Sequence, residues 1–158
     1  MKMNVKPWSL GRILPLALIL CVIGCTHDPY QQRADAIKDR VESFYSNLKS
    51  DRVASAIRDN EQIEAMAGQM GQTIRTRVNQ PAMNQLDREG LLYKTASETA
   101  VENWLSLGRY FVIKKRYDQA RATYQRILDT YSGPAYRTYT EQAAAGLRDV
   151  NIVDPPKS

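Results

Sequence analysis

Apolar side chains recur at alternating steps of four and three residues along most of this chain, which is the spacing of an amphipathic helix. One stripe covers residues 30–48, and a looser one covers residues 53–78. Asp28 followed by Pro29 is typical of an N-cap and a first helical position, while Ser50-Asp51 predicts a turn and a new cap between the two helices. Because no window alternates polar and apolar residues as a strand does, we expect an all-α fold.

The longest stripe allows two interpretations. It continues without a break past Thr95, which favours one helix over about residues 82–115. Thr99 followed three residues later by Glu102 is also the pattern of a capping box, which would start a separate second helix there. The sequence favours the single helix, because no helix-breaking residue lies between Thr95 and Thr99.

Two shorter helices are expected after residue 116, over residues 117–131 and 135–150. The segment between them contains Gly133, which we expect in the left-handed conformation of a helix C-cap, and Pro134, which blocks continuation. Residues 151–158 are expected to form a flexible tail. The sequence thus predicts a small bundle of antiparallel helices.

Domain organisation is simple at this level. No Gly/Ser linker and no block of like charge divides residues 30–150 of the expected domain, which covers residues 25–150. A segment of this length is the size of one domain with its own core. We therefore expect a single helical domain.

A motif of alternating large and small residues lies within residues 101–134. It comprises Trp104, Leu107, Gly108, Phe111, Ala120, Tyr124 and Pro134. The tetratricopeptide repeat (TPR) has the signature W-x2-L-G-x2-Y, A-x3-F and P within about 34 residues. This segment resembles one such repeat, with Phe111 in place of the signature tyrosine and Tyr124 in place of the signature phenylalanine. The resemblance implies a helical hairpin in which these side chains pack together, and a protein that binds other proteins.

The resemblance covers one repeat only. Residues 43–60 offer at most a degenerate hairpin, with Phe44 where the glycine should be. About three repeats are needed for a stable array, so residues 30–100 must supply the missing surface as a non-repeat bundle. The helix over residues 135–150 resembles the capping helix that closes many TPR arrays. A long peptide-binding superhelix is therefore not expected.

Candidate partner-binding residues follow from the same resemblance, because TPR grooves are lined mainly by the first helix of each hairpin. Off the packing stripe of that helix lie Glu102, Leu105, Arg109, Val112 and Ile113. A fully exposed face would not need three apolar residues. The alternative is that a neighbouring helix covers them. The Lys and Asn set of chaperone-binding TPRs is absent, so capture of C-terminal peptides is not supported.

The first residues have the character of a secretory leader. Lys2, Lys6 and Arg12 precede an apolar run over residues 13–23, which is short for a membrane span. Val22-Ile23-Gly24-Cys25 then resembles the lipobox of bacterial lipoproteins. That resemblance implies removal of residues 1–24 as a signal peptide and acylation of Cys25. An ordinary secretion signal that ends near Cys25 is the alternative.

Acylation would place the protein in the cell envelope. More than one acyl chain gives stable membrane attachment. In lipoproteins of two-membrane bacteria an aspartate after the cysteine commonly retains the protein at the inner membrane. Here Thr26 follows, so the resemblance implies the outer membrane, with the domain facing the periplasm.

Charge and composition exclude other classes. Removal of the leader leaves 19 of the 22 basic side chains against 17 acidic ones, so a nucleic-acid partner loses its electrostatic support. His27 is the only histidine, and neither a nucleophile elbow nor a phosphate-binding glycine loop occurs. We expect no enzyme, no cofactor and no metal site. Glu61 and Glu64 are interpreted as part of a solvated face.

Two functions remain after these exclusions. The first is an adaptor or scaffold that docks an envelope protein through the TPR domain. The alternative is a structural lipoprotein that associates with itself through the stripes of residues 30–48 and 53–78, without a dedicated groove.

Overall fold

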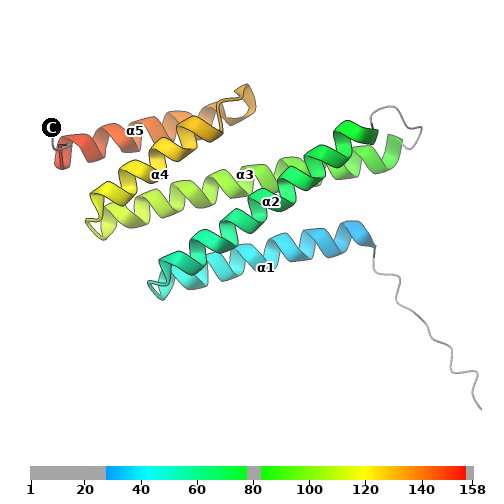
Figure 1. Ribbon diagram of the computed structural model, residues 1–158, viewed down its shortest axis with the longest axis horizontal. Helices are drawn as coiled ribbons and strands as arrows, with labels where there is room; N and C mark the ends of the chain where they lie inside the picture. The colour runs from blue at the N-terminus through cyan, green and yellow to red at the C-terminus, as the bar shows by residue number, and fades with distance from the viewer. Residues whose placement is uncertain (1–27, 78–82, 156–158) are drawn as a thin grey trace, which may run out of the picture.

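The computed structural model describes residues 28–77 and 83–155, and these form a bundle of α-helices (Figure 1). The helices are α1 (Pro29–Lys49), α2 (Val53–Arg77), α3 (Met83–Ile113), α4 (Tyr117–Thr130) and α5 (Arg137–Val153), with a short 3-10 helix η1 (Pro134–Tyr136) before α5. Successive helices run in opposite directions (Figure 1). The expected all-α fold is confirmed. The leader, the lipobox and Cys25 lie outside the described residues.

Helix α3 is the central element of the bundle. It is one helix of 31 residues in which Thr99 is internal, so the capping-box alternative is wrong. Helices α1 and α2 pack along it, with Ala96 and Ala100 in a buried cluster that includes Ile37 and Ile63. Helices α4 and α5 also pack against its second half. Because α3 is shared, both halves of the bundle are built on one continuous helix.

The first helix begins as its sequence indicates. The Asp28 carboxylate accepts a hydrogen bond of 3.0 Å from the Tyr30 backbone N–H, and Pro29 occupies the first helical position. This bond satisfies one of the donors that a helix start leaves without a partner. The cap therefore fixes where α1 begins.

The two tight turns use left-handed residues that are not glycine. Asp51 between α1 and α2 has φ 55°, and Lys115 between α3 and α4 has φ 56°. In each turn the next residue donates back to a helical carbonyl, Arg52 to Asn47 and Arg116 to Phe111, both at 2.8 Å. These are the bonds of a Schellman motif, which satisfies the last carbonyls of a helix.

The expectation for Gly133 is wrong. Its backbone is extended, with φ −73° and ψ 154°, and it precedes η1 instead of capping α4 in the left-handed conformation. The reason is Pro134, whose ring disfavours helical backbone at the residue before it and favours the extended region. Pro134 itself is exposed and opens η1.

The core between α3, α4 and α5 interlocks large side chains with small ones. Trp104, Leu107, Phe111, Ala120 and Tyr124 are all at most 3% exposed. The Tyr124 ring lies against two glycines on different helices. A Cβ atom would lie 2.5 Å from this ring at Gly108 and 2.6 Å from it at Gly146. The absence of a side chain at both positions is what lets the three helices approach.

The C-terminal boundary differs from the sequence expectation. Helix α5 continues to Val153 instead of ending near residue 150. Beyond it, Arg121 of α4 donates to the Asp154 backbone carbonyl at 2.6 Å and to its carboxylate at 2.8 Å. Of the residues assigned to the tail, 151–153 are therefore helical, and Asp154 is bonded to α4.

Candidate protein-binding groove

A groove of about 440 Å³ runs between α3 and α5. Its α3 side is formed by Leu105, Arg109, Val112 and Ile113, its α5 side by Gln142, Ala145, Gly146 and Asp149, and Tyr124 of α4 also lines it. Helices α3 and α5 run in the same direction because α4 reverses the chain between them (Figure 1). Successive turns of α3 and of α5 therefore line the groove in the same direction.

The structure brings the five sequence-derived candidates to one surface. Four of them line the α3–α5 groove, and Glu102 lines an adjoining hollow of about 290 Å³ with Tyr45 and Tyr139. Leu105 and Arg109 line both hollows, so the two share a border. Their grouping follows from their spacing on one helix, and the opposite wall could not be assigned from the sequence.

The apolar candidates differ in exposure. Leu105 is 3% exposed and belongs to the buried cluster that includes Ala143 of α5, so neighbouring helices cover it, as the alternative interpretation holds. Val112 is half-buried, while Ile113 is 78% exposed. Neighbouring helices thus cover the first apolar residue and leave the last one open to solvent.

The polar side chains set the charge of the groove. Arg109 is exposed and donates a hydrogen bond of 2.7 Å to the Gln142 side chain, which links α3 to α5 across the opening. Burial raises the pKa of the Tyr124 hydroxyl; the positive charge of Arg109 opposes this shift and the negative charge of Asp149 adds to it. The groove therefore combines an apolar floor with one positive and one negative side chain.

A polar cluster on another face went unrecognised in the sequence. The expectation that Glu64 lies on a solvated face is wrong: its side chain is 21% exposed. Its carboxylate accepts from the Trp104 indole N–H at 2.8 Å, from the Tyr131 hydroxyl at 2.6 Å and from Arg126 at 2.8 Å. The Arg126 guanidinium also stacks 4.2 Å from the centre of the Trp104 ring.

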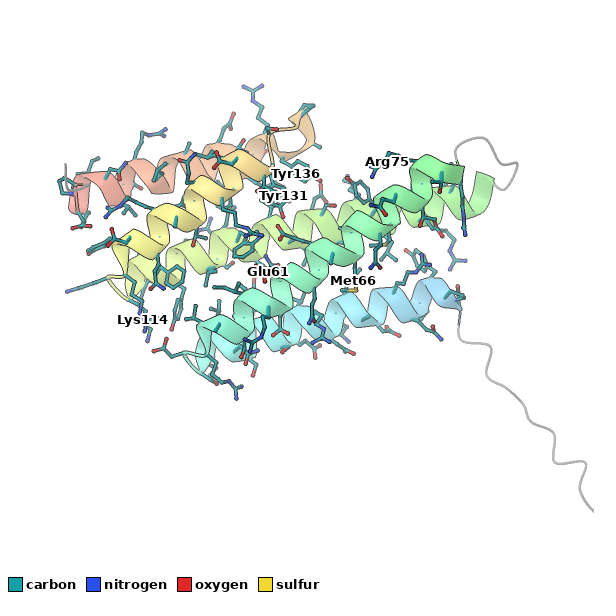
Figure 2. The ribbon with its side chains drawn as sticks, in the orientation of Figure 1. Glu61, Met66, Arg75, Lys114, Tyr131 and Tyr136 are labelled. Carbon is teal, nitrogen blue, oxygen red and sulfur yellow. The ribbon has the colours of Figure 1, made fainter. Side chains whose placement is uncertain are left out.

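This cluster joins α2 to α3 and α4. Tyr131 in turn packs edge-to-face on Tyr136 at the start of α5, with ring centres 5.1 Å apart (Figure 2). A satisfied, partly buried carboxylate of this kind fixes how helices sit against one another. The available signal was weak: Glu64 follows Ile63 directly, at the border of the α2 stripe.

A second polar set is fully internal. The Asn60 side chain is 0% exposed, donates to the Ala100 backbone carbonyl at 3.0 Å and accepts from the Asn103 side chain at 2.9 Å. Nearby, Asp59 accepts from Ser43 and Asn47 of α1, each at 2.7 Å. Buried polar groups need such partners, so these side chains set the register between helices.

Within residues 28–77 and 83–155, no group of three or more His, Cys, Asp or Glu side chains is placed to hold a metal ion. In the same residues, no helix has both the length and the apolar character needed to cross a bilayer.

Comparisons with protein-family models, with curated proteins and with solved structures each returned no match for this chain.

Proposed function

We propose that this protein is a lipid-anchored lipoprotein of the cell envelope, facing the periplasm from the outer membrane, and that it acts as a protein–protein adaptor through the α3–α5 groove. The observation that carries the proposal is the groove itself. It joins exposed Ile113 and charged Arg109 to an apolar floor, on the face that the TPR resemblance implies for binding.

The packing of the C-terminal half supports the TPR interpretation of α3 and α4. In such a hairpin small residues let large ones interlock, and the Tyr124 ring lies against Gly108 in this way. Helix α5 then covers the hairpin where a following repeat would begin, with Gly146 against the same ring. The groove is accordingly formed by two helices in the positions that line TPR grooves.

The character of the groove suits a protein partner. Cores of protein interfaces are apolar and enriched in arginine, with a polar rim. Ile113 and half-buried Val112 supply apolar contact, while Arg109 and Asp149 supply charge of both signs. A segment that carries an apolar anchor beside an acidic residue would meet Ile113 and Arg109 together.

Self-association through α1 and α2 is the less favoured alternative. The apolar stripes on which it depends are used inside the bundle: Ile37, Phe44, Ile63 and Met70 are each at most 5% exposed. Burying them again between two copies would first require opening the bundle. The stripes therefore leave little apolar surface for a dimer.

Crosslinking in intact cells, followed by mass spectrometry, tests the adaptor. The full-length protein is compared with Arg109→Glu and with Ile113→Asp, which alter exposed groove residues. Arg58→Glu is the matched control, because Arg58 is an exposed α2 side chain bonded to Ser55 of its own helix. Envelope proteins captured by the wild type and by the control, and lost in both groove variants, would support the adaptor.

Two other outcomes would change the conclusion. Unchanged capture by both groove variants would remove the groove from the mechanism. Recovery of the protein alone would shift the interpretation to self-association.

The anchor is tested separately. We expect metabolically supplied palmitate to label the wild type and not Cys25→Ser, and density-gradient fractionation to place the labelled protein with the outer membrane. A wild-type protein without label would refute the lipobox interpretation while leaving the groove untouched.

A further inference from the structure

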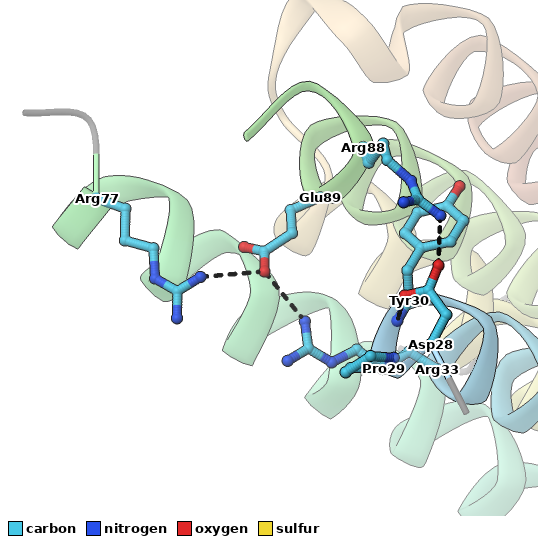
Figure 3. A pocket seen from close by; sticks show the side chains of 7 residues that line it. All are labelled: Asp28, Pro29, Tyr30, Arg33, Arg77, Arg88 and Glu89. Carbon is cyan, nitrogen blue, oxygen red and sulfur yellow. Dashed lines mark hydrogen bonds and ion pairs between the residues drawn. The ribbon is translucent and has the colours of Figure 1, made fainter. Parts of the chain in front are cut away.

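A pocket of about 280 Å³ lies where α1 starts, α2 ends and the early turns of α3 pass (Figure 3). It is distinct from the α3–α5 groove. Three arginines from three helices meet there, namely Arg33, Arg77 and Arg88, together with the carboxylates of Asp28 and Glu89. The lining therefore carries one positive charge in excess.

Arg33 and Arg77 share a single acceptor. Both donate to Glu89 Oε1, at 3.5 Å and 3.4 Å, which is longer than the roughly 2.7–2.9 Å of a strong charge-assisted bond. The second oxygen, Oε2, is buried and accepts no hydrogen bond from the described residues. Each guanidinium has five N–H donors, and each of the two side chains remains nearly half exposed. Glu89 thus holds two arginines at the pocket without saturating them.

Arg88 completes the set from the other side of the pocket. It donates to Asp28 Oδ2 at 2.6 Å, and its guanidinium stacks 4.5 Å from the centre of the Tyr30 ring (Figure 3). Stacking and the ion pair fix the orientation of the guanidinium, while 57% of the side chain stays exposed. A ligand would find this arginine already positioned.

The pocket lies next to the proposed anchor. Asp28 is three residues after Cys25, and three residues span at most about 11 Å. The headgroup layer on each side of a bilayer is itself roughly 5–7 Å thick. If Cys25 carries the acyl chains, as the proposed function requires, the pocket is held within reach of the headgroups.

We propose that this pocket binds the phosphate of an anionic phospholipid headgroup, so that the start of α1 and the end of α2 rest against the membrane. The arginine fork matches a phosphate in shape as well as in charge. The consequence concerns the groove: Arg109 follows Glu89 by 20 residues on α3, roughly 30 Å along the helix. Ile113 and the end of α5 lie at the opposite end of the bundle (Figure 1). Docking would therefore direct the groove away from the bilayer.

The test uses the full-length protein in two kinds of vesicle. One kind is pure phosphatidylcholine, whose phosphate is paired with its own ammonium, and the other also contains phosphatidylglycerol. Hydrogen exchange is measured at the amides of the first turn of α1 and around Glu89. The variant is Arg33→Gln/Arg77→Gln, and the matched control is Arg58→Gln/Arg137→Gln, which removes two exposed arginines elsewhere.

We expect slower exchange in the vesicles with phosphatidylglycerol for the wild type and the control. Removing one arginine near an anionic surface should lower the ratio of docked to undocked protein about fivefold. The pocket variant removes two arginines, so this ratio should fall about 25-fold. Equal exchange in both vesicle types, or protection retained by the pocket variant, would overturn the proposal. Thermal melts of both variants show whether the bundle stays folded, and Arg88→Gln alone provides a milder second variant.

Two further measurements distinguish lipid phosphate from free phosphate, and failure of the pocket from failure of the anchor. Inorganic phosphate is added to the phosphatidylcholine vesicles; if it reproduces the protection, the site takes free phosphate and the lipid proposal is wrong. The mass of the Cys25 peptide reports acylation independently. If Cys25 is unmodified, the anchor has failed, and co-sedimentation of the purified chain with each vesicle type then decides whether the pocket binds lipid.

Discussion

The Tyr124 ring, which lies against glycines of α3 and α5, provides the sharpest test of the fold. Replacing Gly108 by alanine would put a methyl group 2.5 Å from Cε1 and 2.9 Å from Cζ of Tyr124. The ring cannot simply move toward α5, because Gly146 already lies so close that a Cβ there would be 2.6 Å from Cζ. A single methyl group must therefore displace a helix or a buried aromatic ring.

The magnitude follows from two opposing terms. Overpacking a core costs about 1–3 kcal/mol, while alanine gains about 1 kcal/mol over glycine inside a helix. Gly90 lies in the same helix and has open space around it, so Gly90→Ala isolates the helix-propensity term. We expect Gly90→Ala to stabilise the protein and Gly108→Ala to destabilise it. The difference between them should be about 1–3 kcal/mol, the overpacking cost alone.

Urea and thermal denaturation followed by circular dichroism measure this difference. For a chain of this size 1 kcal/mol shifts the melting temperature by about 3–5 °C, and an unchanged m-value shows that unfolding remains comparable. Combining Gly108→Ala with Tyr124→Leu should relieve the clash, so the alanine becomes stabilising in that background. If Gly108→Ala and Gly90→Ala raise the melting temperature equally, the close packing of Tyr124 on Gly108 is wrong.

Two further predictions concern buried polar groups. Asn60→Ala should lower the free energy of unfolding by at least about 1–3 kcal/mol, because the Asn103 amide loses its acceptor. Replacing Asn60 and Asn103 together by leucine should cost less than Asn60→Ala alone. Urea titration measures both variants, and a single variant that costs less than the double one would contradict the pairing. Burial, with the hydrogen bond to Glu64, raises the pKa of the Tyr131 hydroxyl above its ordinary 10.0. Since the folded state holds this proton more tightly, the contribution is fully present below about pH 10 and is lost as pH rises toward the folded pKa. Because the acceptor is a carboxylate, Tyr131→Phe should cost about 1.5–3 kcal/mol at neutral pH and weaken the fall of stability in alkali. An identical alkaline profile for both proteins would argue against the shift.

Local features of the chain were predictable where neighbouring residues decide the energy. The Asp28 cap, the single helix α3 and the burial of Trp104 follow from capping chemistry and periodicity, which act within a few residues. Gly133 is a local feature that was misjudged, because the restriction imposed by Pro134 outweighs the preference of glycine for a left-handed cap.

The turn at Ser50-Asp51 was expected, but the left-handed backbone of Asp51 and Lys115 was not predictable in the same way. A positive φ is sterically strained for a residue other than glycine, and the sequence signal for such a turn is weak. Their turns nevertheless form because the helices on either side pack against each other, and the Tyr110 hydroxyl on α3 also donates to the Asp51 carboxylate. Packing across the bundle thus offsets the local strain.

The candidate groove was likewise predictable only in part. The spacing of Arg109, Val112 and Ile113 puts them on one helix face, since residues three and four apart share a face. Which of the apolar residues would be accessible depended on the neighbouring helices, which bury Leu105 and leave Ile113 open. The role of Gly146 also depends on tertiary structure, because it arises from the contact of α5 with the Tyr124 ring.

Sequence periodicity therefore determined that this chain is helical, where most helices begin and end, and which face of each helix is apolar. Tertiary structure decided which of those faces meet, that Glu64 is a shared acceptor, and that Arg33, Arg77 and Arg88 surround one pocket. The physical reason is range. Hydrogen-bonded helices and caps depend on residues a few positions apart, whereas Glu64 and Tyr131 are 67 positions apart and meet only after the bundle has formed.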